Sequence, residues 1–131
     1  MSLRLILVRL IPSVILAQTL LFKFSGAPES IYIFNTLGVG TPGRIGSGVI
    51  ELLAVILLMI PKTTYLGSLL TIATMSGAVM SHLFILGIEI QEDGGLLFSL
   101  AIVTLVFAVI NLYISQFKIV KNLRGLINTG K

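Results

Sequence analysis

The chain has 131 residues, of which 56% are hydrophobic and only 11% are charged. A soluble domain must cover its surface with polar side chains, so this composition excludes an ordinary soluble protein and indicates an integral membrane protein. With no cysteine and one histidine, the chain cannot form disulfides, iron–sulfur clusters or a bis-histidine haem by itself, and we expect no metal site. We interpret the net charge of +4 as a topology signal rather than a sign of nucleic-acid binding.

Four apolar stretches follow one another along the chain. Each is long enough to cross a hydrocarbon core of ~30 Å, which takes about 17–25 helical residues. They predict an all-α fold, with residues 1–131 forming a single membrane domain built as a bundle of four transmembrane helices. Pro12 lies inside the first span and predicts a kink there. The expected spans are residues 5–23, 42–60, 64–86 and 95–117.

The first span has a second interpretation, as a signal peptide, because "SGA" before Pro28 resembles a small-x-small cleavage site. Pro28 itself disfavours cleavage, and Arg9 interrupts the apolar region, so we favour a retained helix. The second span carries its own start signal. Thr41 is the expected N-cap, and Pro42 suits the first helical position.

Residues 28–37, which connect the first two spans, predict a short helix at the membrane interface. The run begins with proline and glutamate, and Ile31, Phe34 and Leu37 fall on one helical face. At the other end of the chain, residues 118–131 form a basic tail. We expect this tail to anchor the topology and to contact anionic lipid.

The lysines and arginines predict the orientation of the bundle. With four spans, both termini and the second connection share one side of the membrane. The other side receives only Lys23 and Arg44. Because cytoplasmic segments are enriched in basic residues, we expect both termini to be cytoplasmic. The basic residues on the expected cytoplasmic side are Arg4, Arg9, Lys62, Lys118, Lys121, Arg124 and Lys131.

Glu51 is the most unusual residue in the apolar spans. It lies about nine residues into the second span, roughly 13 Å from its outer end, which is too deep for a short side chain to reach water. A charge at that depth costs several kcal/mol unless it faces the bundle interior and finds a partner. Glu51 is therefore either part of a binding site or proton path, or a buried group that only fixes the packing.

Several other polar residues approach Glu51 from the same side of the membrane. Lys23 ends the first span and is long enough to pair with Glu51, although it could also reach the headgroups. His82 lies near the outer end of the third span, as a site residue or as an interfacial histidine. Asp93 is a site candidate or the N-cap of the fourth span. The candidate site residues are Glu51, Lys23, Arg44, His82, Gln18 and Asp93. Asn111, deep in the fourth span, is expected to bond helices together.

Three segments, "LLFKFSG", "GRIGSGVIELLAVILLMIP" and "EDGGLLFSLAIV", resemble the DoxX family of small bacterial membrane proteins. The family pattern has a lysine ending the first helix, a Gly-x-x-Glu-Leu element in the second and an Asp-Gly-Gly element before the fourth. These positions fall here on Lys23, on Glu51 with Leu52, and on Asp93 with Gly94 and Gly95. The resemblance implies a four-helix bundle in the bacterial cytoplasmic membrane, in a family linked to quinol oxidase and thiosulfate:quinone chemistry.

Three functions fit these patterns. The first is a binding or accessory subunit of a membrane oxidoreductase, which holds a quinone- or lipid-like molecule beside Lys23 and Glu51. The second is a small proton-coupled transporter in which His82 relays protons to Glu51. The third is a structural or assembly protein whose buried charges only specify its packing. Whatever the function, we expect membrane lipids and copies of the chain itself among its partners. An autonomous enzyme is the least favoured, and no residue is predicted to be catalytic.

Overall fold

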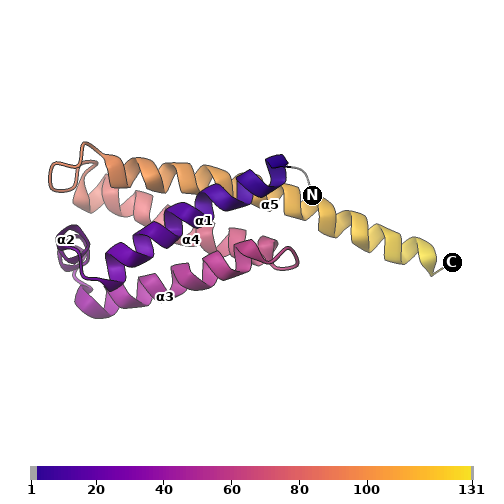
Figure 1. The fold of residues 1–131 in the computed structure, drawn as a ribbon, viewed down its shortest axis with the longest axis horizontal. Helices are drawn as coiled ribbons and strands as arrows, with labels where there is room; N and C mark the ends of the chain where they lie inside the picture. Colours follow the sequence, from indigo (N-terminus) through magenta and orange to yellow (C-terminus); the bar gives the residue numbers. More distant parts are fainter. Residues whose placement is uncertain (1–2, 131) are drawn as a thin grey trace.

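The computed structural model describes the backbone of residues 3–130, and the side chains of those residues other than 117–120 and 122. Within this range the chain is helical and has no strand. The helices are α1 (Leu3–Phe24), α2 (Pro28–Thr36), α3 (Gly40–Met59), α4 (Thr64–Ser81), the π-helical turn η1 (His82–Leu86) and α5 (Leu96–Thr129). Figure 1 shows α1, α3, α4 and α5 running alternately in opposite directions, with the short α2 across one end.

Four segments are long and apolar enough to cross a membrane, which confirms that part of the predicted fold. They are Leu3–Phe24, Gly40–Met59, Thr64–Leu86 and Leu96–Gln116. Each long helix packs against two neighbours, so that α1 and α4 both contact α3 and α5. We call the end that holds α2 and residues 87–95 the α2 end, and the end that holds residues 60–63 the opposite end.

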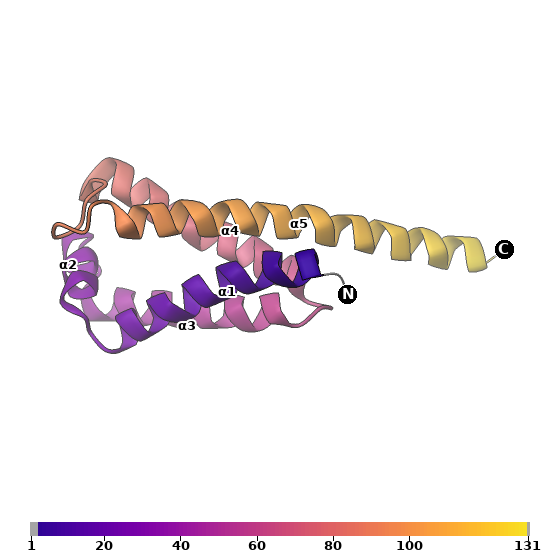
Figure 2. The ribbon, with the colours of Figure 1, turned by 45° about the horizontal axis from the view of Figure 1, so that its top comes forward.

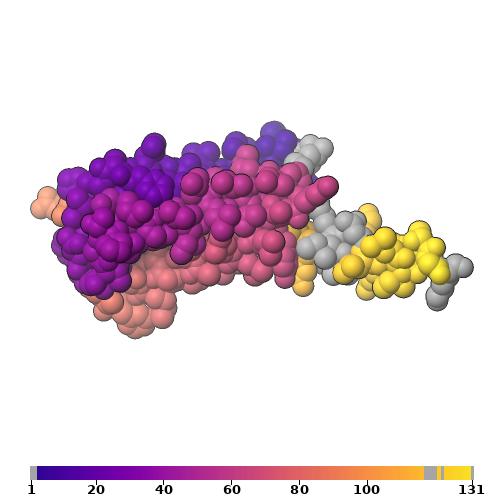
Figure 3. Space-filling model, turned by 90° about the horizontal axis from the view of Figure 1, so that it is seen from below, coloured from indigo at the N-terminus to yellow at the C-terminus, as the bar shows by residue number. Residues whose placement is uncertain are grey.

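The surface of the bundle is rich in large apolar side chains. Leu21 on α1 and Phe84 in η1 are both 74% exposed, and exposed leucines, isoleucines and valines occur on every long helix. Figure 3 shows one such face, with α3 between α1 and α4. A surface of this kind suits contact with lipid chains rather than water.

The backbones of α3 and α4 are in close contact near the opposite end. A Cβ atom added at Gly67 would lie 2.5 Å from the backbone N of Leu58 and 2.8 Å from the carbonyl C of Leu57. Thr63 donates a hydrogen bond to Leu57 O at 2.9 Å, and Thr64 to Leu58 O at 3.2 Å. The tight chain reversal at 60–63 therefore holds these two helices together, and Figures 1 and 2 show them diverging toward the α2 end.

Two arginines join α1 and α3 reciprocally. Arg9 of α1 donates hydrogen bonds to Leu58 O and Met59 O at the end of α3. Arg44 of α3 donates to Lys23 O at the end of α1. A helix C-terminus has unpaired carbonyl groups and a partial negative charge, so each cation stabilises the end of the other helix.

Two helix boundaries differ from the sequence-based expectations. Thr41 is not the N-cap of α3, because the helix begins at Gly40, directly after the left-handed Gly38 (φ 80°) reverses the chain. At the other end of the chain, α5 does not stop near residue 117 but continues to Thr129, beyond the bundle (Figure 2). Most of the basic tail is thus a helical extension of the fourth span. Lys131 and the side chain of Lys118 lie outside the described part of the chain.

Candidate functional site

Lys23 and Glu51 form an ion pair between α1 and α3. Lys23 Nζ also donates to Ser47 Oγ at 3.2 Å, and Thr19 Oγ1 donates to the second carboxylate oxygen of Glu51 at 3.2 Å. The side chains of Lys23 and Glu51 are only 12% and 3% exposed. The predicted contact between them is therefore present in the structure, and it is desolvated.

The sequence allows this contact because α3 carries a glycine, Gly48, where α1 packs against it. A Cβ atom added at Gly48 would lie 2.8 Å from an edge carbon of the Phe24 ring, so a larger residue there would require this ring to move. The ammonium group of Lys23 also lies 5.7 Å from the centre of the Phe34 ring, which α2 brings over it. The aromatic face attracts the cation and shields it from the α2 end.

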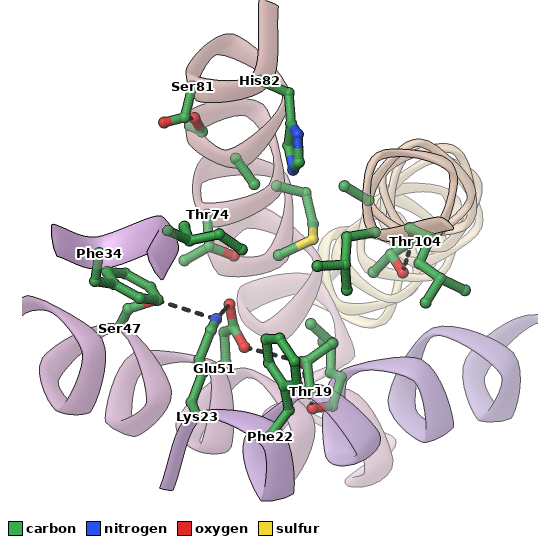
Figure 4. Close-up of a pocket in the computed structure, with 18 of the residues that line it drawn as sticks. Thr19, Phe22, Lys23, Phe34, Ser47, Glu51, Thr74, Ser81, His82 and Thr104 are labelled. Carbon is green, nitrogen blue, oxygen red and sulfur yellow. Dashed lines mark hydrogen bonds and ion pairs between the residues drawn. The ribbon is translucent and has the colours of Figure 1, made fainter. Parts of the chain in front are cut away.

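A cavity of about 330 Å³ lies beside the ion pair (Figure 4). All five α-helices and η1 contribute to its wall, and most of the lining side chains are apolar. Lys23, Glu51, Thr19 and Ser47 form one polar region of the wall. The apolar remainder includes Leu16, Phe22, Ile33, Phe34, Met75, Leu97 and Leu100.

His82 lines the same cavity from the side of α4, and Figure 4 shows its ring directed inward. Its Nδ1 atom lies 2.9 Å from Gly87 O. A carbonyl oxygen only accepts, so Nδ1 carries a hydrogen, and Nε2 of the neutral ring is then an acceptor. The ring packs edge-on against Phe98, at 5.6 Å between ring centres. His82 is therefore a buried member of the cavity wall, held by contacts on both sides of its ring.

Asp93 does not line the cavity. Its carboxylate accepts hydrogen bonds from the backbone N–H groups of Ile90 (3.0 Å), Gly95 (2.8 Å) and Leu97 (3.1 Å). Partial desolvation opposes its charge, but the hydrogen bonds from these backbone N–H groups favour it, and the pKa of Asp93 lies below the ordinary value of 3.8. The N-cap residue of α5 is Gly95 and not Asp93 as the alternative had it, but the Asp93 carboxylate accepts from Gly95 and Leu97 and so stabilises the start of the helix.

Two further candidates lie away from the cavity. Gln18 is exposed on α1, because it is turned about 100° around the helix from Thr19, which faces Glu51. Arg44 is engaged with Lys23 O and does not line the cavity, although it supports the helix end that carries Lys23. Of the six candidates, the structure brings Glu51, Lys23 and His82 to one cavity.

Sequence reasoning did not identify Thr19 or Phe34 as site residues. Thr19 precedes Lys23 by one helical turn on the same face, so its spacing was the available signal. Phe34 belongs to the α2 face that was expected to meet lipid, and instead it covers Lys23. Asn111 was expected to join helices, and this is confirmed, because it donates to Val8 O at 2.7 Å.

Neither protein-family models, nor curated proteins, nor solved structures gave a match to this chain. The resemblance to the DoxX family therefore rests on the three quoted segments alone. In the part of the chain that the structure describes, no three His, Asp or Glu residues are grouped as a metal site would require. Within its described residues the structure defines an all-helical chain with four candidate membrane spans and a largely apolar cavity that has an ion pair in its wall.

Proposed function

We propose that this protein binds a small, mainly apolar molecule, quinone- or lipid-like, inside the membrane. The observation that carries this proposal is the apolar cavity of about 330 Å³ with the Lys23–Glu51 pair in its wall. Binding sites for small molecules are typically apolar cavities of about 300–1,000 Å³ with a few polar groups that orient the ligand. The ion pair, Thr19 and His82 supply such groups.

The physiological role that we propose is that of a binding or accessory subunit of a membrane oxidoreductase. The DoxX-like segments motivate this role, and with it a location in the bacterial cytoplasmic membrane. Autonomous redox chemistry is disfavoured, because the chain has no cysteine. Membrane lipids and further copies of the chain are the other proposed partners.

The proposed orientation places both termini in the cytoplasm and the α2 end outside. Single cysteines introduced at Asn128 and at Glu29 provide a test, because the chain has no cysteine of its own. A membrane-impermeant maleimide applied to intact cells should label the cysteine at position 29 and leave the one at position 128 unlabelled. After permeabilisation both should react. Labelling of both in intact cells would contradict the four-span arrangement.

Filling the cavity tests the binding function. Ala78 lines the cavity, whereas Ala73 is an exposed residue on the same helix that does not line it. Replacing Ala78 with leucine should remove the bound molecule, because the added side chain occupies its space. Ala73→Leu should leave it in place. Native mass spectrometry of gently solubilised protein gives the mass of the bound molecule in each case.

Thermal unfolding of the two variants provides the control for folding, and filling a cavity commonly stabilises a protein by about 0.5–2 kcal/mol. If the wild-type protein carries no ligand and takes up none from added membrane extract, the binding function is wrong. Equal retention by Ala78→Leu and Ala73→Leu would also overturn it.

A proton-coupled transporter is the second candidate, because Glu51 and His82 border the same cavity. Both are groups that exchange protons in membrane transport. Ligand-dependent proton flux into liposomes containing the purified protein would favour this function over a binding subunit.

A further inference from the structure

Two residues of the cavity wall are exposed on the surface of the bundle. Among the residues that line it, only Ile50 and Gly77 are exposed, and the others are buried or half-buried. Ile50 lies on α3, where it is 44% exposed, and Gly77 lies on α4. The exposed part of the wall therefore lies on two neighbouring helices, at the side of the bundle.

The packing of α3 against α4 explains why the cavity wall is exposed at Ile50 and Gly77. The two helices are in backbone contact at Gly67 and Leu58, and they diverge toward the α2 end (Figures 1 and 2). Ten residues after Gly67, a Cβ atom added at Gly77 would have no atom within 4 Å. Gly77 therefore lies on the part of α4 where the two helices have diverged, and it faces open space.

The α2 end of the bundle is covered, in contrast to its side. Helix α2 lies across that end, and Ile33, Phe34 and Leu37 from this segment form part of the cavity wall. A molecule that arrives from water would have to displace these apolar side chains. A molecule dissolved among lipid chains meets the exposed part of the wall, at Ile50 and Gly77, directly.

The polar wall indicates what kind of head group fits. Lys23 and Glu51 neutralise each other, and the ammonium group also lies near Ser47 Oγ and the Phe34 ring. A charged head group would remain uncompensated in this apolar space, which is costly. A hydroxyl or carbonyl group needs no counter-charge, and a hydroxyl can donate to the acceptor Nε2 of His82 or to the carboxylate.

The volume limits the apolar part of the ligand. About 330 Å³ is at the small end of the range for ligand cavities, so one chain or one ring fits. An entry at Ile50 and Gly77 would let a longer chain extend into the surrounding lipid.

We propose that the cavity is filled from within the bilayer, through a gap between Ile50 and Gly77, by an uncharged single-chain amphiphile with a hydroxyl or carbonyl head. This inference rests on the proposed binding function and adds the route and the ligand class. A photoreactive long-chain alcohol is the probe, and the alkyl sulfonate of the same chain length is its charged counterpart. Each is added to phosphatidylcholine vesicles that contain the protein, and labelling is triggered after increasing times.

Replacing Gly77 with leucine should narrow the gap and slow labelling of cavity residues by the alcohol about tenfold, within the one to three decades over which mutations change association rates. Ala17→Leu, which also enlarges an exposed small residue but on α1 away from the cavity, is the matched control and should label at the wild-type rate. Ile50→Ala widens the gap from α3 and should accelerate labelling. The alkyl sulfonate should not label cavity residues.

Three results would overturn the inference while leaving the binding function intact. The first is wild-type labelling rates in both Gly77→Leu and Ile50→Ala. The second is equal slowing by Gly77→Leu and Ala17→Leu. The third is labelling of the cavity by the sulfonate as readily as by the alcohol. If neither probe nor any membrane extract occupies the wild-type cavity, the binding function itself fails.

Discussion

Replacing Glu51 with glutamine should destabilise the folded bundle by about 3–5 kcal/mol, the usual cost of leaving one member of a buried ion pair without its partner. The side chain of Lys23 is only 12% exposed, and the carboxylate of Glu51 is the counter-charge of its ammonium group. Glutamine keeps the size and the acceptor for Thr19 but not the charge. The free energy of unfolding in detergent micelles, obtained by denaturant titration, measures the loss.

A double-mutant cycle measures the interaction energy between Lys23 and Glu51 apart from their contacts with other groups. Lys23→Met alone should also be destabilising, whereas the double variant Lys23→Met/Glu51→Gln should regain much of the loss, because no uncompensated charge is left. Glu92→Gln is the control, since Glu92 is exposed in the connection before α5. If the double variant is no more stable than the less stable of the two single variants, Lys23 and Glu51 are not energetically coupled.

Replacing Gly67 with alanine should cost about 3 kcal/mol, the upper part of the usual range for overpacking. The added methyl would lie 2.5 Å from the backbone N of Leu58 and 2.8 Å from the carbonyl C of Leu57. These are main-chain atoms of α3, held by the hydrogen bonds from Thr63 and Thr64. They cannot rotate away as a side chain would, so α4 must move as a whole. Thermal unfolding in micelles would register the loss as a lowered midpoint.

Gly77→Ala is the matched control for this prediction, because it makes the same change on the same helix where the space is open. In a helix, alanine is more favourable than glycine by about 1 kcal/mol, so Gly77→Ala should be neutral or stabilising. Equal effects of the two substitutions would show that helix propensity, and not the close contact of α3 with α4, decides the outcome.

The helices were predictable because their signals are local. Each span is an apolar run of the length that a bilayer requires, and Pro28 marks the start of α2 in the sequence itself. The end of α5 was not predictable from hydropathy, because residues 118–129 lose their apolar character without meeting a proline. Hydropathy reports where a helix leaves lipid, and it does not report where the helix stops.

The site was predictable only in part, because side-chain direction depends on how helices rotate against one another. Depth in the membrane was enough to pair Lys23 with Glu51 and to bring His82 near them. Depth alone could not place Gln18, which lies at the right level but on the outside of α1. Nor could it reveal that Arg44 would bind a main-chain carbonyl, since such partners leave no trace in the sequence.

Helix α5 is a single unbroken helix that connects the cavity wall to a free end outside the bundle. Leu97 and Leu100 form part of the cavity wall near one end of this helix, and its other end at Thr129 projects beyond the bundle. Between them, Asn111 donates a hydrogen bond to Val8 O of α1. At 1.5 Å per residue the stretches of α5 on either side of Asn111 measure about 21 Å and about 27 Å. A tilt of α5 about this point therefore moves the cavity wall and the free end of the helix in opposite directions, by comparable amounts.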